Sequence, residues 1–372
     1  MNLKNSEIAL LNLVSCGAGI CNDVCLSELS ANDWHEVFDD SERQGVSAVC
    51  VDGFNALRPV LPSDGTLEYR KLQWFGGVMQ MEQLYGEHLS SIESLAKFYH
   101  SEGVKMMLLK GYGLSLDWPV PNHRPVGDID IYLFDLWDFA DQMLRKKLGI
   151  DVNKDHHHHT VFTFDGVTVE NHYDFINVHS HRSNVEVESI FKKLAKERQT
   201  EYMLSNGVVI YLPSPILNAL FLARHMGIHF AAEHLTLRQI LDWALFVRVH
   251  HEEVDWNLFW ENMKQMNMHK FVLSVNAICC EYLGFDKELF YTPMKYKNFA
   301  VESRTLVERV LMDVLHPADG DLDENEQYTK QRLRLWWKNR WKHRIVYSDS
   351  LFSTFFAQIK SHLMKPSTIF HE

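Results

Sequence analysis

Two aspartates one residue apart, Asp128 and Asp130, form the part of the chain best suited to chemistry, in the run Val-Gly-Asp-Ile-Asp-Ile-Tyr-Leu over residues 126–133. Alternate side chains of a β-strand share a face, so both carboxylates should point one way and the isoleucines the other. Two carboxylates this close raise each other's pKa unless a cation lies between them. Mg²⁺ or Mn²⁺ prefers oxygen ligands and fits that need. The alternative is a solvated strand edge that carries two aspartates.

A third carboxylate follows in the segment Gly166–Tyr173, where Glu170 shares one face with His172 and Asp174. If this strand lies beside that of Asp128, three carboxylates converge and can hold two metal ions. One ion would activate an attacking hydroxyl, and the other would neutralise a triphosphate and its leaving pyrophosphate. The alternatives are a polar face on an edge strand, or Asp174 as the third ligand.

A glycine turn at Lys110-Gly111 follows an apolar run and opens a short helix. Backbone N–H groups and the helix dipole at such a turn suit phosphate, although the spacing is not that of a Walker A loop. Lys110 and Arg124 can add positive charge against phosphate oxygens. The expected nucleotide-binding residues are Lys110, Gly111, Arg124 and Gly127.

Hydrophobic periodicity predicts the elements that position these residues. An α+β protein is expected, with a small mixed sheet enclosed by helices. Strands are predicted over 104–109, 126–134, 157–164 and 167–173, the last two joined by an Asp165-Gly166 hairpin. Helices are predicted over 67–100, 136–148, 235–250, 255–266 and 270–283, with a further one capped by Ser214. The expected regions are N-terminal helices (1–103), a catalytic core (104–212), a helical domain (213–316), and an acidic loop with an aromatic, basic tail (317–372).

The net charge, the apolar runs and the cysteine spacings argue against several classes of protein. The formal net charge is -12, which argues against broad nucleic-acid binding. No apolar run is long enough for a transmembrane helix, and no signal peptide is recognised, so a cytoplasmic location is expected. The six cysteines lack metal-site spacings and are expected to be reduced and mostly buried, with a loose metal cluster at Cys16, Cys21 and Cys25 as the alternative.

Other candidates have structural explanations. The four-histidine run 156–159 should present two rings on each face of a strand, too few for a closed zinc site. His225 and His229 are four residues apart on a helix and can bind zinc, but packing explains them as well. Arg238 and Asp242 are an expected intrahelical ion pair lining the cleft. The basic tail 330–344 suits an anionic surface or RNA, or a helix whose tryptophans pack inward.

Together these segments resemble a known family. Leu-Lys-Gly at the end of a strand, a proline-containing loop with Arg124, and Gly-Asp-Ile-Asp are similar to the bacterial uncharacterised nucleotidyltransferases of the DNA polymerase β-like superfamily. The resemblance continues through residues 166–173, His225, the Leu-Arg-Gln-Ile-Leu-Asp-Trp run at 237–243 and Val-Asp-Trp at 254–256, and covers about residues 5 to 290. One departure is Tyr112, which stands where the superfamily has a phosphate-binding serine; Ser115 follows only later.

The resemblance implies transfer of a nucleoside monophosphate from an NTP to an acceptor hydroxyl, with Mg²⁺ or Mn²⁺ as cofactor. It assigns Asp128 and Asp130 as metal ligands and Glu170 as third ligand and general base. Apart from the resemblance, His172, Arg238 and Asp242 are expected as residues of the substrate cleft. The acceptor is an unidentified small molecule, sugar or protein. The alternatives are a transferase acting on a protein side chain and a non-catalytic nucleotide-binding or interaction protein.

Overall fold

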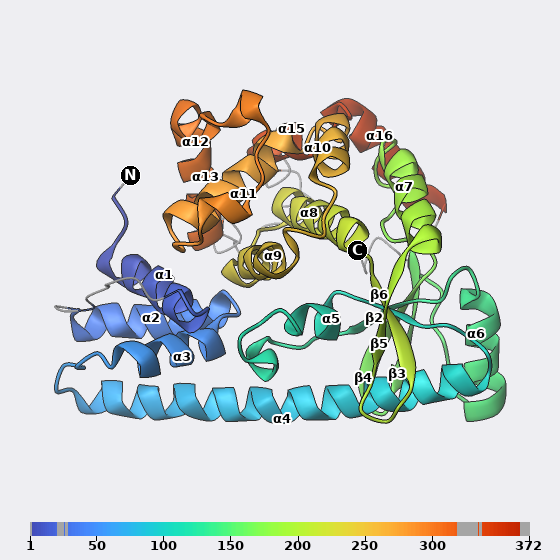
Figure 1. Ribbon diagram of the computed structural model, residues 1–372, viewed down its shortest axis with the longest axis horizontal. Helices are drawn as coiled ribbons and strands as arrows, with labels where there is room; N and C mark the ends of the chain where they lie inside the picture. The colour runs from blue at the N-terminus through green and yellow to red at the C-terminus, as the bar shows by residue number, and fades with distance from the viewer. Residues whose placement is uncertain (1, 21–25, 27–28, 318–333, 335–336, 365–372) are drawn as a thin grey trace.

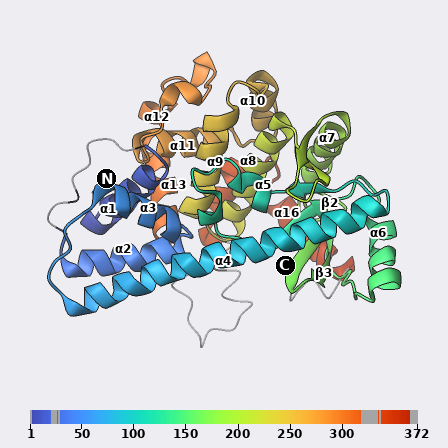
Figure 2. The ribbon, with the colours of Figure 1, turned by 60° about the horizontal axis from the view of Figure 1, so that its bottom comes forward.

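The computed structural model describes the chain apart from residues 1, 21–25, 27–28, 318–333, 335–336 and 365–372. A long helix runs along one side of the molecule, with the N-terminal helices over one of its ends and a sheet over the other (Figure 1). A second view shows the same helix in front of both parts (Figure 2). The first helices are α1 (Asn5–Gly17), α2 (Ala31–Arg43), α3 (Ser47–Leu57) and α4 (Gly65–Ser101).

Local sequence explains where these helices begin. Ser30 accepts a hydrogen bond from the backbone N–H of Asp33 and caps α2 in a reciprocal capping box. Asp64 accepts from the backbone N–H groups of Thr66 and Leu67 and caps α4. The predicted helix 67–100 is therefore confirmed and begins two residues earlier.

The sheet contains six strands in the order β3-β4-β2-β1-β6-β5. Their bounds are β1 (Met107–Leu109), β2 (Ile129–Tyr132), β3 (His159–Phe164), β4 (Val167–His172), β5 (Gln199–Met203) and β6 (Val209–Pro213). β2 is parallel to β4 and β1 to β6, and the other neighbours are antiparallel. The expected mixed sheet is confirmed, as is the hairpin, since Asp165 and Gly166 both have the positive φ of its turn.

The two faces of the sheet have different partners. Ile129 and Ile131 are buried in a core with Leu95 and Tyr99 of α4 and with Ala140 of α6 (Trp137–Met143). The opposite face carries Met107, Leu109 and Tyr132 into a larger core shared with the C-terminal helices. The predicted alternation in the Asp128 segment is thus confirmed, and its carboxylates lie on the side of the helical region.

The remaining helices form that helical region. Their bounds are α5 (Gly111–Ser115), α7 (Asn184–Glu197), α8 (Pro215–Ala232), α9 (Leu237–His250), α10 (Trp256–Gln265), α11 (His269–Glu281), α12 (Phe299–Glu302), α13 (Arg304–Leu315), α15 (Arg340–Val346) and α16 (Leu351–Met364). Short helical turns occur at Pro121–His123, Leu144–Leu148, Lys287–Leu289 and Met294–Tyr296. None of the helices in the described part of the chain combines the length and apolar character needed to cross a membrane.

Several expectations need correction. Helix α7 and strands β5 and β6 were not predicted. In α7 a signal was present, since its buried residues Val187, Phe191 and Leu194 recur at helical spacing. Ser214 precedes α8, but its hydroxyl makes no cap hydrogen bond; Asp255 does cap α10, accepting from Leu258 N–H at 3.0 Å. Cys16 forms a disulfide, so uniformly reduced thiols were wrongly expected.

The C-terminal segment agrees in part with the expected alternative, a helix whose tryptophans pack inward. The Trp341 ring packs against Phe230 and under the Arg309 guanidinium, whereas Trp337 is 57% exposed. The predicted acidic loop falls almost wholly outside the described residues, as does Trp336.

A close crossing of α1 and α3 depends on glycine. A Cβ on Gly53 would lie 2.1 Å from the Leu13 carbonyl oxygen, which is backbone and cannot rotate away. We expect Gly53→Ala to lower the free energy of unfolding by about 1–3 kcal/mol, the scale of overpacking a core. Gly86→Ala on α4, with nothing within 4 Å of the added carbon, should instead stabilise by about 0.5–1 kcal/mol. Urea denaturation measures both; equal effects from the two substitutions would contradict the close crossing.

Candidate active site

Three carboxylates meet where β2 and β4 run side by side. Asp130 on β2 is paired in register with Glu170 on β4, and paired residues of neighbouring strands share a face. Asp128 lies two residues before Asp130, immediately ahead of β2. The structure therefore brings together the three acidic residues that the sequence singled out.

Asp130 is the most buried of the three carboxylates and has two close side-chain partners. Its Oδ1 atom lies 2.8 Å from Lys110 Nζ and 3.0 Å from His172 Nε2, and the residue is only 8% exposed. Burial opposes the charged carboxylate, but Lys110 and His172 outweigh it and hold the pKa of Asp130 well below its usual range. Asp130 is therefore an anion fixed in place by two partners.

The pKa of Asp128 shifts in the opposite direction from that of Asp130. Partial burial, followed by the negative charges of Glu170 and Asp130, raises its pKa, and Lys110 and His88 only partly compensate. The charges of its two neighbours thus add to burial in disfavouring the charged form of Asp128, and a divalent cation would relieve that repulsion.

Glu170 lies between two histidines. Its Oε2 is 3.3 Å from His172 Nε2, and its Oε1 is 3.7 Å from His159 Nε2. Burial opposes ionisation of Glu170, but the hydrogen bond from His172 lowers its pKa. Burial likewise disfavours charged His172, yet Asp130 and Glu170 prevail and raise its pKa. His172 thus joins two of the carboxylates.

The Lys110-Gly111 turn projects its lysine to this site. Lys110 and Gly111 both have positive φ, 49° and 40°, and α5 begins at Gly111. A positive φ is unfavourable for a lysine, so the turn holds it in an uncommon conformation. Ser115 is committed elsewhere, donating to the Tyr112 carbonyl and lying 2.8 Å from the Tyr85 hydroxyl.

Arg124 and Arg238 differ from the roles expected for them. Arg124 is buried, and its guanidinium donates to both oxygens of Asp242 at 2.8 and 3.0 Å. Trp118 also donates to Asp242, at 2.9 Å. The expected pair between Arg238 and Asp242 is therefore replaced by one with Arg124, and Arg238 Nε is buried with no hydrogen-bond partner among the described residues.

Helices on either side add histidines near the carboxylates. His88 of α4 hydrogen-bonds to the Gly127 carbonyl and is close enough to Asp128 to affect its pKa. Periodicity gave no signal for His88, since it is one polar residue in a long mixed helix. His225 and His229 of α8 lie near Lys110 and Asp130, and burial lowers the pKa of His229 to about 4. Both are neutral rings near the site at neutral pH.

Asp174, the alternative third ligand suggested by the sequence, pairs with a residue outside the site. Asp174 forms an ion pair with Lys192 of α7, and Glu188 of the same helix accepts the backbone N–H groups of Phe175 and Ile176. Asp174 therefore helps to fix the chain after β4 to α7.

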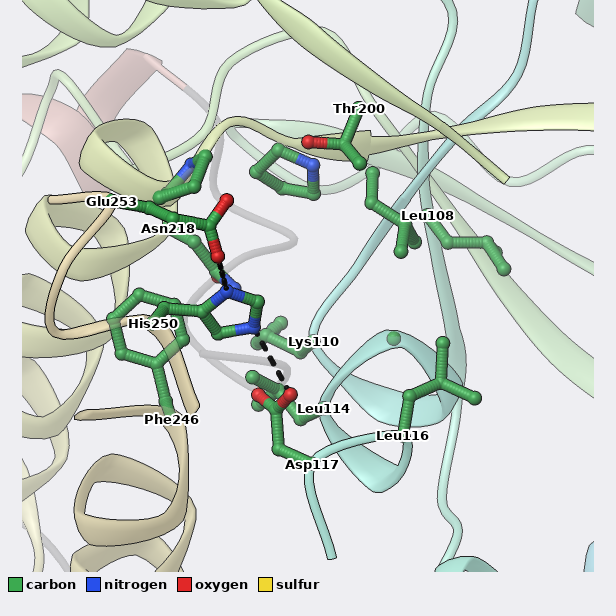
Figure 3. Close-up of a pocket in the computed structure, with 14 residues that line it drawn as sticks. Leu108, Lys110, Leu114, Leu116, Asp117, Thr200, Asn218, Phe246, His250 and Glu253 are labelled. Carbon is green, nitrogen blue, oxygen red and sulfur yellow. Dashed lines mark hydrogen bonds and ion pairs between the residues drawn. The ribbon is translucent and has the colours of Figure 1, made fainter. Parts of the chain in front are cut away.

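A cavity of about 130 Å³ opens beside the Lys110 turn, between α5, β6 and α9. Its lining includes Lys110, Thr200 and Asn218. In Figure 3 the His250 ring crosses this space and joins Asp117, at 3.0 Å, to Glu253, at 2.9 Å. The cavity thus offers apolar walls with polar groups close to the lysine that holds Asp130.

Comparisons with known proteins identify a family. The pattern of the family described as "Uncharacterised nucleotidyltransferase" matches residues 30–284. An antigenic nucleotidyltransferase-like protein from Paracoccidioides brasiliensis is similar at 15% identity over 44% of this chain and 77% of its own, with a TM-score of 0.32. No curated protein matches the sequence. Because the family match spans more than half of the chain and includes all three carboxylates, the chain belongs to the uncharacterised nucleotidyltransferase family.

Proposed function

We propose that this protein is a metal-dependent nucleotidyltransferase of the DNA polymerase β-like type. It would transfer a nucleoside monophosphate from an NTP to an acceptor hydroxyl and release pyrophosphate. The pairing of Asp130 with Glu170 on adjacent parallel strands, with Asp128 two residues away, carries the proposal. Membership of the family supports the NTP as donor.

The acidic residues fit a hard divalent cation. All three offer carboxylate oxygens, and one ligand atom each from Asp130, Glu170 and His172 lie within 4.8 Å of one another. Burial first, and then the charges of Glu170 and Asp130, raise the pKa of Asp128, and a divalent cation would favour its charged form. Asp128, Asp130 and Glu170 would hold Mg²⁺ or Mn²⁺, which when bound supplies positive charge to the triphosphate and the leaving pyrophosphate.

The protein's own groups have distinct tasks in this scheme. The acceptor oxygen forms a bond to the α-phosphorus as the bond to the bridging oxygen breaks, and the acceptor proton passes to Glu170 Oε. His172 orients Glu170 and Asp130 through its Nε2. Lys110 keeps Asp130 ionised, and the backbone N–H groups of Gly111 and Gly127 would be available to phosphate oxygens.

The positive charge for the triphosphate is proposed to come from Lys110 and Arg238 rather than from Arg124. Both oxygens of Asp242 already satisfy the Arg124 guanidinium, so we assign Arg124 to positioning the loop before β2. Among the described residues, Arg224 and Arg238 each have a buried Nε without a hydrogen-bond partner. The rest of the Arg224 guanidinium donates to Asn184 and the Val346 carbonyl, whereas the charge of Arg238 reaches His225 and His229 beside Asp130. Buried donors in native proteins normally have partners, and a phosphate oxygen would provide one.

Replacing Glu170 by glutamine tests the proposal. Glu170→Gln keeps the shape but cannot take the acceptor proton, so transfer should slow by about a hundredfold or more while NTP binding persists. Asp128→Asn should weaken binding of the metal–NTP complex as well as transfer. Pyrophosphate release with each of the four NTPs, with cell-extract fractions as acceptor source, gives the rates, and calorimetry with and without Mg²⁺ gives the affinities.

Two alternatives make different predictions in the same assay. A transferase acting on a protein side chain would lose activity when the extract is treated with protease. A non-catalytic nucleotide-binding protein would bind NTP but release no pyrophosphate with any fraction, and Glu170→Gln would then be indistinguishable from wild type. That last result would remove the catalytic proposal.

A further inference from the structure

Three histidine rings gather beside the carboxylates, at the ends of β3 and β4. One ligand atom each from His158, His159 and His172 lie within 4.8 Å of one another. Their ring centroids are 4.4 Å apart for His158 and His159, 5.5 Å for His158 and His172, and 5.2 Å for His159 and His172. Three imidazoles are thus assembled from two segments of the chain.

The backbone explains how neighbours in sequence reach one place. His159 begins β3 and is paired with His172 of β4, so these two share a face of the sheet. His158 lies in the bend over residues 156–158, before the strand begins. The strand alternation expected for the run 156–159 therefore does not apply to His158, and His172 supplies the ligand from outside the run that a site requires.

Three ring nitrogens of His158 and His159 lack partners, whereas His172 has them: its Nε2 lies 3.0 Å from Asp130 Oδ1, and its Nδ1 lies 3.3 Å from the Asp174 carbonyl oxygen. Both nitrogens of His159, a residue only 5% exposed, and Nδ1 of His158 are buried without a hydrogen-bond partner among the described residues. The nearest carboxylate oxygen to His159, on Glu170, is 3.7 Å away, beyond hydrogen-bonding distance. Buried imidazole nitrogens left unpaired are uncommon and indicate a water or an ion.

We propose that His158, His159 and His172 form a binding site for a divalent transition metal of the zinc class that adjoins the carboxylate site and shares His172 with it. Three imidazoles with a fourth position open to solvent or substrate is a common zinc arrangement. Nitrogen ligands also distinguish this site from one for Mg²⁺, which prefers oxygen. The two sites adjoin through His172, and this one does not depend on nucleotidyl transfer.

The experiment uses the full chain, stripped of metal and supplied with excess Mg²⁺. Zn²⁺ is titrated by calorimetry, and Co²⁺ is followed by its visible absorption, which is strong when four or five ligands surround the ion. We expect one bound ion per chain that Mg²⁺ does not displace. His158→Asn and His159→Gln should each weaken its binding by about tenfold or more, at least the effect of losing a supporting residue of a metal site.

His157→Asn is the matched control, because it removes a ring from the same run that packs against His179 and is not one of the three grouped histidines. It should keep the affinity, whereas equal weakening in all three variants would indicate loose binding to the run and overturn the proposal. Thermal melting without metal confirms that each variant folds. Binding lost only in Asp130→Asn would place the ion on the carboxylates and also overturn it, whatever the outcome of the NTP assays.

Discussion

Asp130→Asn is expected to reduce nucleotidyl transfer by about a thousandfold or more, the upper range for removing one electrostatic contact to a transition state. Among the three carboxylates, Asp130 is the buried one, and it has a pKa held low by Lys110 and His172. Asparagine keeps its shape but removes the charge around which the lysine, the histidine and the proposed metal are organised. Pyrophosphate release measures the rate, and calorimetry with Mg²⁺ and NTP measures binding, which should also weaken.

Asp174→Asn is the matched control for that substitution. Asp174 lies on the same segment as Glu170, and alternation alone allows it to be the third ligand, but the structure pairs it with Lys192 on α7. Its loss should leave transfer within a few-fold of wild type. A large loss in Asp174→Asn together with an active Asp130→Asn would contradict the assignment of the site.

The shared face of Asp128 and Asp130 could be predicted because it depends on local geometry. The period of two places Asp128 and Asp130 on one face, and the Asp165-Gly166 turn fixes the neighbouring hairpin. What the sequence left open was whether β2 lies beside β4. That adjacency depends on packing of the sheet between α4 and α8, and no short pattern encodes it.

Other features of the site arise from contacts far apart in the sequence. Arg124 and Asp242 are separated by 118 positions, and the intrahelical spacing of Arg238 and Asp242 pointed to a different pair. The i, i+4 rule places two side chains on one helix face, but it does not tell whether a third residue competes for the carboxylate. Here the planar guanidinium of Arg124 donates two hydrogen bonds to Asp242, and Arg124 forms the ion pair in place of Arg238.

That buried pair should have the largest effect on stability. Arg124 and Asp242 are 6% and 5% exposed. Arg124→Met leaves a buried carboxylate with Trp118 as its remaining side-chain donor, and Asp242→Leu leaves a buried guanidinium without its anion. Each is expected to lower the free energy of unfolding by about 3–5 kcal/mol, the scale of stranding one buried charge. Urea denaturation measures the loss. Arg43→Met, which breaks the half-exposed pair of Arg43 with Asp40, should cost no more than about 1 kcal/mol.

The double variant Arg124→Met/Asp242→Leu separates positioning from phosphate binding. Removing both charges leaves neither stranded, so most of the lost stability should return. If Arg124 only positions the loop before β2, the stable double variant should recover both its stability and an NTP affinity near the wild-type value. If Arg124 instead contacts the triphosphate, affinity stays low although the protein is stable. In that case Arg124 would be a phosphate ligand, and the assignment of that charge to Arg238 would be wrong.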